Sequence, residues 1–239
     1  KVLKQDSKNV SALYNKGLAL NQIKKYTDAV TCFEELLVIN PKDAQAFNNK
    51  GIAMAEMGNI QDASECYDKA IAADPKYAAS YFNKGVLLDK LQEHEEALVS
   101  LEKAITIDPR KQNVLVYKGI VLGKMKRHEE ALNCFQNICK KYPNNQDAFF
   151  QKGVQLAELG EHKKALDVFD DILRKFKDNV NVVYAKSRSK AALEMYPEAL
   201  ELLKQAVSKN PKIIRVWAKE EKIFEKLHGN EQFRKLVKL

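Results

Sequence analysis

The tripeptide Asn-Lys-Gly starts at residues 15, 49 and 83, so it recurs every 34 residues. A fixed period of this length is typical of proteins built from copies of one supersecondary unit. When Val10 is counted as the first position of a copy, two later positions carry only small residues. Position eight is glycine in five copies and position twenty is alanine in all six: Gly17, Gly51, Gly85, Gly119, Gly153; Ala29, Ala63, Ala97, Ala131, Ala165, Ala199. The period therefore predicts six copies between residues 10 and 213.

The apolar residues of each copy predict two helices. Positions four, eight and eleven lie three or four residues apart, which places them on one helical face, and positions twenty, twenty-four and twenty-seven form a second face. Short turn signals such as Met57-Gly58-Asn59 separate the two faces and leave room only for an antiparallel pair. Because glycine inside a helix costs about 1 kcal/mol relative to alanine, we expect the glycine to let the second helix approach closely.

These positions, together with the prolines that close five of the copies, resemble the tetratricopeptide repeat family from Val10 to Pro211. The resemblance implies an all-α fold, a right-handed α-solenoid superhelix of antiparallel helix pairs whose first helices line a concave groove. The chain is then a single domain, 1–239, with repeats at 10–43, 44–77, 78–111, 112–145, 146–179 and 180–213. Its Lys-Gly pairs are similar to those of arrays from methanogenic archaea.

The two ends of the chain depart from the repeat. Residues 1–9 fall where a preceding second helix would end, as in a fragment of a longer protein. Residues 214–239 form an altered seventh unit, in which Trp217 and Phe224 take the apolar positions four and eleven. Phe233 replaces the alanine, and so bulky a residue does not permit the usual close approach. We therefore expect residues 214–239 to form capping helices.

Composition favours a protein of the cytoplasm. The 40 basic and 32 acidic side chains give a net charge of +8, which is a mild excess for 239 residues and makes nucleic-acid binding a minor alternative. No apolar run reaches the roughly 18 residues that span a bilayer. The four cysteines form no CxxC pair, as in proteins of a reducing compartment.

No motif of catalysis, cofactor binding or metal binding stands out. Histidines recur at position seventeen as His94, His128 and His162, but packed helices lie about 10 Å apart, whereas Zn–N bonds measure about 2 Å. We therefore expect these rings to pack rather than to share an ion. Lysine occupies position seven of every copy, on the side of the helix away from the concave face. We expect its stem to pack between helices and its ammonium group to meet water or an acid.

The concave face carries the candidate binding site. Position nine is apolar in five copies, and an apolar strip without a packing partner indicates a binding surface, although packing between first helices is the alternative for any one residue. The asparagines at position six resemble the asparagine ladder of the O-linked N-acetylglucosamine transferases, whose amides hold a peptide backbone. The candidate peptide-binding residues are Asn15, Asn49, Ile52, Phe82, Asn83, Val86, Tyr117, Ile120, Phe150, Gln151, Val154 and Arg188.

The sequence thus predicts a non-enzymatic scaffold for protein–protein interaction, without cofactor or metal. Its partner is an extended or helical segment of another protein, or of a second copy bound through the groove or the termini. The alternatives are a recruiting or regulatory arm of a larger protein or enzyme and, less favoured, a basic nucleic-acid binder.

Overall fold

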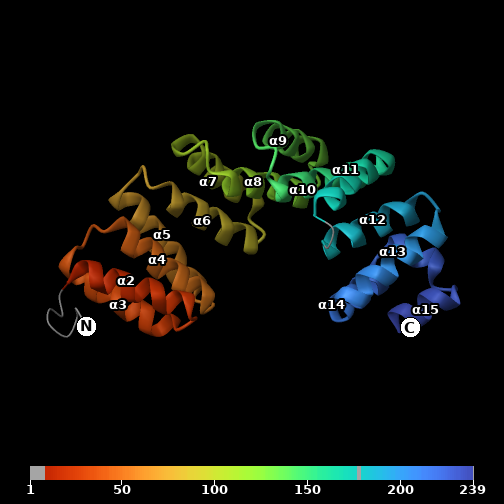
Figure 1. Ribbon diagram of the computed structural model, residues 1–239. Coiled ribbons are helices and arrows are strands. Elements are labelled where there is room, and N and C mark those ends of the chain that lie inside the picture. The colour runs from red at the N-terminus through yellow and green to blue at the C-terminus, as the bar shows by residue number, and fades with distance from the viewer. Residues whose placement is uncertain (1–8, 177–178, 239) are drawn as a thin grey trace. The chain divides into compact units, whose positions relative to one another are not determined.

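The computed structural model describes residues 9–176 and 179–238, and every regular element in these ranges is a helix (Figure 1). The predicted remnant of a preceding helix lies outside the described residues, except for Asn9, which caps the first helix instead. The first helices of the repeats are α2 (Val10–Gln22), α4 (Ala44–Glu56), α6 (Ala78–Lys90), α8 (Gln112–Lys124), α10 (Gln146–Glu158) and α12 (Val180–Ala192). The second helices are α3 (Tyr26–Ile39), α5 (Ile60–Ala73), α7 (His94–Ile107), α9 (His128–Lys141), α11 (His162–Lys175) and α13 (Tyr196–Lys209).

Each first helix begins 34 residues after the previous one, at the first residue of a predicted repeat. Asparagine or aspartate precedes four of these helices, and its side chain accepts a hydrogen bond from the N–H three residues on: Asn9, Asp43, Asn145 and Asn179. Such caps satisfy a backbone donor that the helix itself leaves unpaired. The all-α fold of paired helices is confirmed, and local capping chemistry contributes to its regularity.

The glycines at position eight lie against the second helix, as predicted. A Cβ atom at Gly17 would stand 2.7 Å from the Phe33 ring, and one at Gly51 would stand 2.7 Å from the Tyr67 ring. Real Cβ atoms do not approach other atoms so closely. In the sixth copy Ser187 replaces the glycine, and its hydroxyl donates a hydrogen bond to the carbonyl of Ala199, the small residue at position twenty.

Four of the six lysines at position seven pair with acids of the preceding repeat. Lys50 Nζ lies 2.7 Å from Glu34 Oε1, and Lys84 Nζ lies 2.5 Å from Asp68 Oδ1. Lys118 and Glu102, which are the same number of residues apart in sequence, form a third such pair at 2.8 Å. In the second half of the chain Lys186 meets Asp170 in the same way. The lysine is the more buried partner in each pair, so the predicted packing of its stem is confirmed.

The chain divides into two compact units, residues 1–121 and 122–239, and the boundary falls inside α8. The core of unit 1 contains Leu13, Phe33, Leu36 and Tyr67, packed around the invariant small residues. The core of unit 2 contains Phe169 and ends in a cluster around Phe224, whose ring centroid lies 5.9 Å from that of Phe233.

The C-terminal elements are α14 (Pro211–Glu220), a 3-10 helix η1 (Lys222–Leu227) and α15 (Glu231–Val237). Phe224 is buried as expected, and Phe233 is buried as well. The prediction for Trp217 is wrong, since this residue is 41% exposed. Because α14 begins at Pro211 rather than at residue 214, Ile214 and Ala218 take its fourth and eighth positions, and both are fully buried. The last unit thus keeps the large-then-small spacing in a shifted register.

Candidate peptide-binding surface

Eight of the twelve candidate residues belong to unit 1, and we call them the first-helix face of unit 1: Asn15, Asn49, Ile52, Phe82, Asn83, Val86, Tyr117 and Ile120. Asn15 is exposed and the other seven are half-buried. The rings of Phe82 and Tyr117, from successive first helices, meet edge to face with centroids 5.8 Å apart. The apolar members therefore pack partly on their neighbours and keep part of their surface open to solvent.

Hydrogen bonds tie the asparagines of this face to adjacent helices. Asn49 Nδ2 donates to Tyr14 Oη at 3.2 Å and to the Gln45 carbonyl at 2.8 Å. Asn83 Nδ2 donates to Oδ1 of the buried Asn48 at 2.9 Å. An amide nitrogen has two hydrogens and an amide oxygen accepts independently of them. Asn83 thus keeps one donor, and both asparagines present an oxygen that accepts no bond from any described residue.

A buried acid organises the end of the same face. Asp89 is 3% exposed, and its carboxylate accepts a 2.7 Å hydrogen bond from Tyr117 Oη and lies 3.0 Å from Nδ1 of His94. Burial, together with this hydrogen bond, raises the pKa of Tyr117. The sequence analysis missed Asp89, although a signal existed, since no other copy has an acid at position twelve. His94 therefore holds a polar contact rather than a purely apolar one.

The four remaining candidates belong to unit 2, and we call them the first-helix face of unit 2: Phe150, Gln151, Val154 and Arg188. The Phe150 ring packs on that of Phe169 with centroids 6.2 Å apart. Arg188 lies between two acids, with Nη2 3.2 Å from Glu158 and Nε 2.7 Å from Glu221. Val154 and Arg188 both line a cavity of about 250 Å³.

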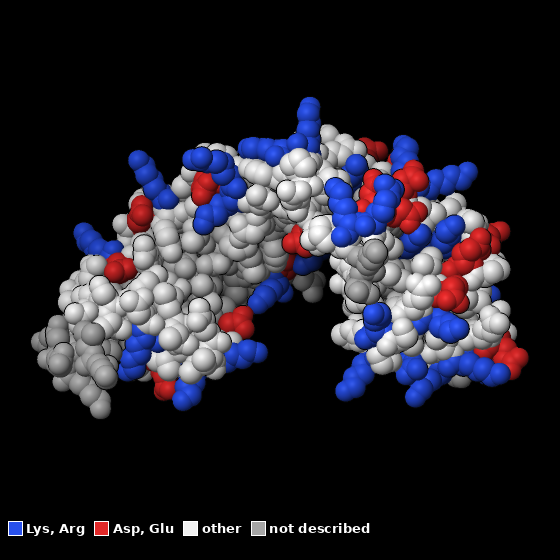
Figure 2. All heavy atoms as spheres, viewed as in Figure 1, with Lys and Arg blue, Asp and Glu red and all other residues white. Residues whose placement is uncertain are grey.

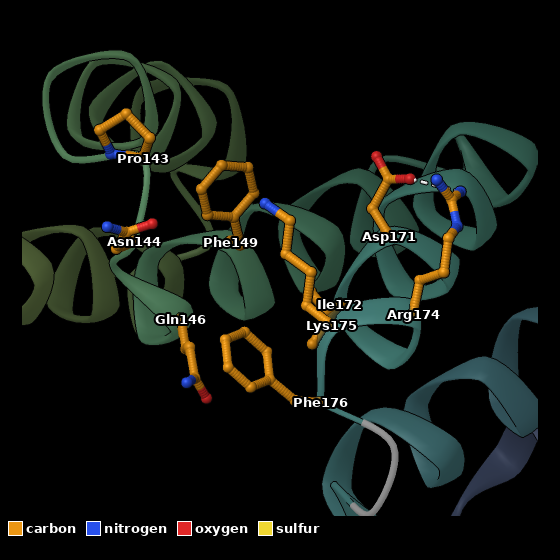
Figure 3. Close-up of a pocket in the computed structure, with 9 residues that line it drawn as sticks. All are labelled: Pro143, Asn144, Gln146, Phe149, Asp171, Ile172, Arg174, Lys175 and Phe176. Atoms are coloured by element: carbon orange, nitrogen blue, oxygen red, sulfur yellow. Dashed lines mark hydrogen bonds and ion pairs between the residues drawn. The ribbon is translucent and has the colours of Figure 1, made fainter.

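A second cavity of unit 2, of about 330 Å³, contains none of the predicted residues (Figure 3). It opens between the loop from α9 to α10 and the end of α11. Figure 3 shows the rings of Phe149 and Phe176 at its walls and Arg174 beside Asp171, which it contacts at 2.7 Å. Phe149 and Ile172 stand at the apolar positions four and twenty-seven, which the repeat pattern assigns to packing, and Pro143 closes a copy. The other lining residues lie at positions that the pattern does not single out, so the sequence contains no signal for a cavity here.

Basic side chains are spread over both units with acids among them (Figure 2). Residues 201–239 carry ten bases and five acids, so most of the net charge of +8 lies there, and several of these cations bond within the protein. Arg215 Nε donates to the Leu236 carbonyl and Lys219 Nζ to the Lys238 carbonyl, both at 3.0 Å, so these cations cap the end of α15. Lys226 lies 2.6 Å from Glu194. Part of the positive charge therefore supports the fold.

Two further searches cover the part of the chain that the structure describes. Within residues 9–176 and 179–238, no three His, Cys, Asp or Glu side chains are grouped so that they could hold a metal ion. Across the same ranges, none of the helices combines the length and the apolar character that crossing a bilayer requires.

Helix pairs stacked at a fixed interval of 34 residues define a helical repeat protein. The chain belongs to the tetratricopeptide repeat family: sequence models described as tetratricopeptide repeat match residues 48–111 and 118–180, and one described as TPR repeat matches residues 17–58. This confirms the resemblance found in the sequence. Members of this family typically act as interaction scaffolds rather than catalysts, and protein or peptide partners follow from the fold.

Solved structures agree with the family. YrrB, described as a TPR protein with an unusual peptide-binding site, is 25% identical with a TM-score of 0.61, over 79% of this chain and 98% of that one. PilF of Pseudomonas aeruginosa is 22% identical with a TM-score of 0.74, over 89% and 97%. A tetratricopeptide repeat protein from Parabacteroides merdae is 16% identical with a TM-score of 0.72, over 96% and 97%. No curated protein sequence matches this chain.

Proposed function

We propose that this protein is a non-enzymatic scaffold that binds an extended segment of a partner protein on its first-helix faces. The observation that carries the proposal is the pattern on unit 1, where half-exposed apolar side chains alternate with anchored amides. Val86 and Ile120 supply apolar contact, while Asn49 and Asn83 present oxygens toward a ligand's backbone N–H groups. Apolar anchors supply most of the energy of such contacts, and backbone bonds add affinity without requiring a particular side chain.

The anchoring of the asparagines supports recognition of a backbone. A side chain already held by the protein loses little conformational freedom when a ligand arrives, and preorganised groups therefore bind at lower entropic cost. Asn49 and Asn83 are each fixed by hydrogen bonds to the scaffold. The description of the 25% identical YrrB as a peptide-binding protein supports the same function.

The proposal places the protein in a reducing compartment, the cytoplasm. All four cysteines are free, and Cys32, Cys66 and Cys139 are buried. Burial raises the pKa of each of these three thiols. Protonated, buried thiols serve as small apolar residues of the core.

The function is tested by selecting peptides from a displayed library of random twelve-residue sequences and measuring their affinity by fluorescence anisotropy. The double variant Val86→Glu, Ile120→Glu should weaken the selected peptides at least about tenfold, because carboxylates replace apolar anchors at the centre of the face. The matched control is Val38→Glu, Val99→Glu, which alters valines of the second helices that are 83% and 60% exposed. The control should bind within about twofold of the parent.

Three results would contradict the proposal. The library could yield no binders, the control could lose as much affinity as the test variant, or the test variant could keep full affinity with its melting temperature unchanged. Single-stranded RNA serves as the comparator in the same assay, since binding to it that persists at 200 mM salt would favour the nucleic-acid alternative over a peptide scaffold.

A further inference from the structure

Two successive contacts between a second helix and the next first helix in unit 2 differ at one pair of residues. In the first contact, between α9 and α10, Nδ1 of His128 lies 2.9 Å from Oε1 of Gln155, so this pair closes the space between the two helices. The corresponding residues 34 positions later are His162 and Ser189. Serine is too short to span the gap, and within the described ranges neither His162 Nδ1 nor Ser189 Oγ has a hydrogen-bond partner, although both atoms are buried.

The space left by this exchange is the cavity of about 250 Å³, which Val154, His162 and Ser189 line together with Phe169 and Ile223. Ser189 has no exposed surface, so its unpartnered hydroxyl belongs to the interior wall. Sites for drug-sized ligands measure about 300–1,000 Å³. The cavity is below that range and suits a single amino-acid side chain.

The charges around the cavity favour a cation. Arg188 is the one guanidinium at this site and contacts two carboxylates, those of Glu158 and Glu221, so the three groups sum to one negative charge. Burial lowers the pKa of His162 and the positive charge of Arg188 lowers it further, while the negative charge of Glu158 acts the other way; the net lowering favours the neutral imidazole. A neutral imidazole offers an acceptor nitrogen. A cationic group in the cavity would therefore find hydrogen-bond acceptors there, and its positive charge would offset the excess negative charge of the two carboxylates.

We propose that this cavity binds the side chain of a lysine in the partner segment, an inference that rests on the proposed function. The four-carbon stem lies against Val154, Phe169 and Ile223. The ammonium group donates its three N–H bonds to the Glu158 carboxylate, Ser189 Oγ and His162 Nδ1. An acidic side chain in the cavity would have to displace Glu158 or Glu221 from Arg188. A purely apolar side chain would leave the Ser189 hydroxyl and the His162 imidazole without hydrogen-bond partners, which costs free energy.

The test uses the full chain, labelled with ¹⁵N, and titrates it with Nα-acetyl-lysine-N-methylamide as the probe while amide chemical shifts are followed by NMR. The glutamine and norleucine analogues serve as matched probes of similar length. Ser189→Gln rebuilds the arrangement of Gln155 and fills the cavity. Glu158→Gln keeps the shape and removes one negative charge. Gln155→Ser is the reciprocal control, because it opens the equivalent space beside His128, where Lys124 stands at the position of Glu158.

We expect saturable shifts at residues around Ser189 with the lysine probe, and binding at least about tenfold weaker for both analogues, as follows from losing a charge-assisted bond. Ser189→Gln and Glu158→Gln should each weaken the lysine probe about tenfold or more. Gln155→Ser should not create a second lysine site, since its cavity would lie beside a lysine. Because Glu158→Gln changes no volume, it tests the inference even if Ser189→Gln unfolds.

The inference is overturned if the lysine probe causes no saturable shift at the cavity, if norleucine binds as tightly, or if Glu158→Gln has no effect. These outcomes leave the proposed function intact when library peptides still bind in a manner sensitive to Val86 and Ile120. Conversely, absence of library binders alongside a lysine-specific shift would contradict the proposed function and not the chemistry of the cavity.

Discussion

At the scale of single residues, the asparagines at position six are chemically alike but differently engaged. The side chain of Asn83 donates to the buried Asn48 and that of Asn49 donates twice. The side chain of Asn15 is exposed and bonds to no other described residue. The recurring tripeptide therefore marks one position in the repeat but three different environments. What a residue contributes to stability depends on the buried partner that it satisfies.

Asn83→Ala should lower the free energy of unfolding by about 1–3 kcal/mol, because Oδ1 of Asn48, a side chain only 3% exposed, loses its donor. Asn15→Ala is the control and should change the same quantity by less than about 0.5 kcal/mol, as is usual at exposed sites. Urea unfolding followed by circular dichroism measures both. Equal losses in the two variants would show that the bond to Asn48 is not what distinguishes Asn83.

The hydrogen-bonding environments illustrate what sequence could and could not predict at this scale. The positions of the glycines, alanines and lysines followed from the period, since each plays the same role in each copy. Asp89 and the exchange of Gln155 for Ser189 are departures from the period, and their partners come from neighbouring repeats. A pattern that describes an average copy does not contain such pairs.

At the scale of helices, the contact between the two helices of a repeat depends on what faces the glycine. At Gly51 a Cβ would stand 2.7 Å from the Tyr67 ring and 3.1 Å from Cβ of Cys66. At Gly85 the nearest atom is Cγ of Leu101, at 3.0 Å. A rigid ring wedged between helices yields less readily than a leucine side chain, so one substitution should have different costs in the two repeats.

Gly51→Ala should therefore destabilise the protein by about 1–3 kcal/mol through overpacking. Gly85→Ala should be close to neutral, because the gain in helix propensity of about 1 kcal/mol offsets a milder clash. Differential scanning calorimetry of the two variants gives the comparison directly. If Gly85→Ala proved the more harmful, the opposing side chain would not be the determinant of the cost.

The helix pairs could be predicted because they recur at a fixed period. The packing of the last unit could not be predicted, because this unit departs from the period. The period places Trp217 on the packed face because it makes residue 214 the start of the seventh copy. Pro211 instead begins α14, as proline can at the first turn of a helix. Ile214 and Ala218 then supply the large and small residues that the packing requires.

At the scale of the whole molecule, the chain has two compact units, 1–121 and 122–239, and each has buried core residues of its own. Unit 1 packs Phe33 and Tyr67 against glycines. Unit 2 packs Phe169 in the same way and adds the aromatic cluster of Phe224 and Phe233 at its end. In a solenoid each repeat contacts only its neighbours, so stability is a sum of local terms. A substitution deep in one unit should then act mainly on that unit.

Trp217 is the one tryptophan of the chain, and it lies in unit 2, with its ring 5.5 Å from that of Tyr184. Its fluorescence therefore reports on unit 2, whereas circular dichroism at 222 nm reports on all helices. Phe233→Ala should shift the fluorescence midpoint in urea strongly, since emptying a fully buried aromatic site costs about 3–5 kcal/mol. Gly51→Leu should instead shift the dichroism curve and leave the fluorescence midpoint nearly unchanged. If each variant moved both midpoints by the same amount, residues 1–239 would unfold as the single domain that the sequence predicts, and the division into two units would carry no energetic meaning.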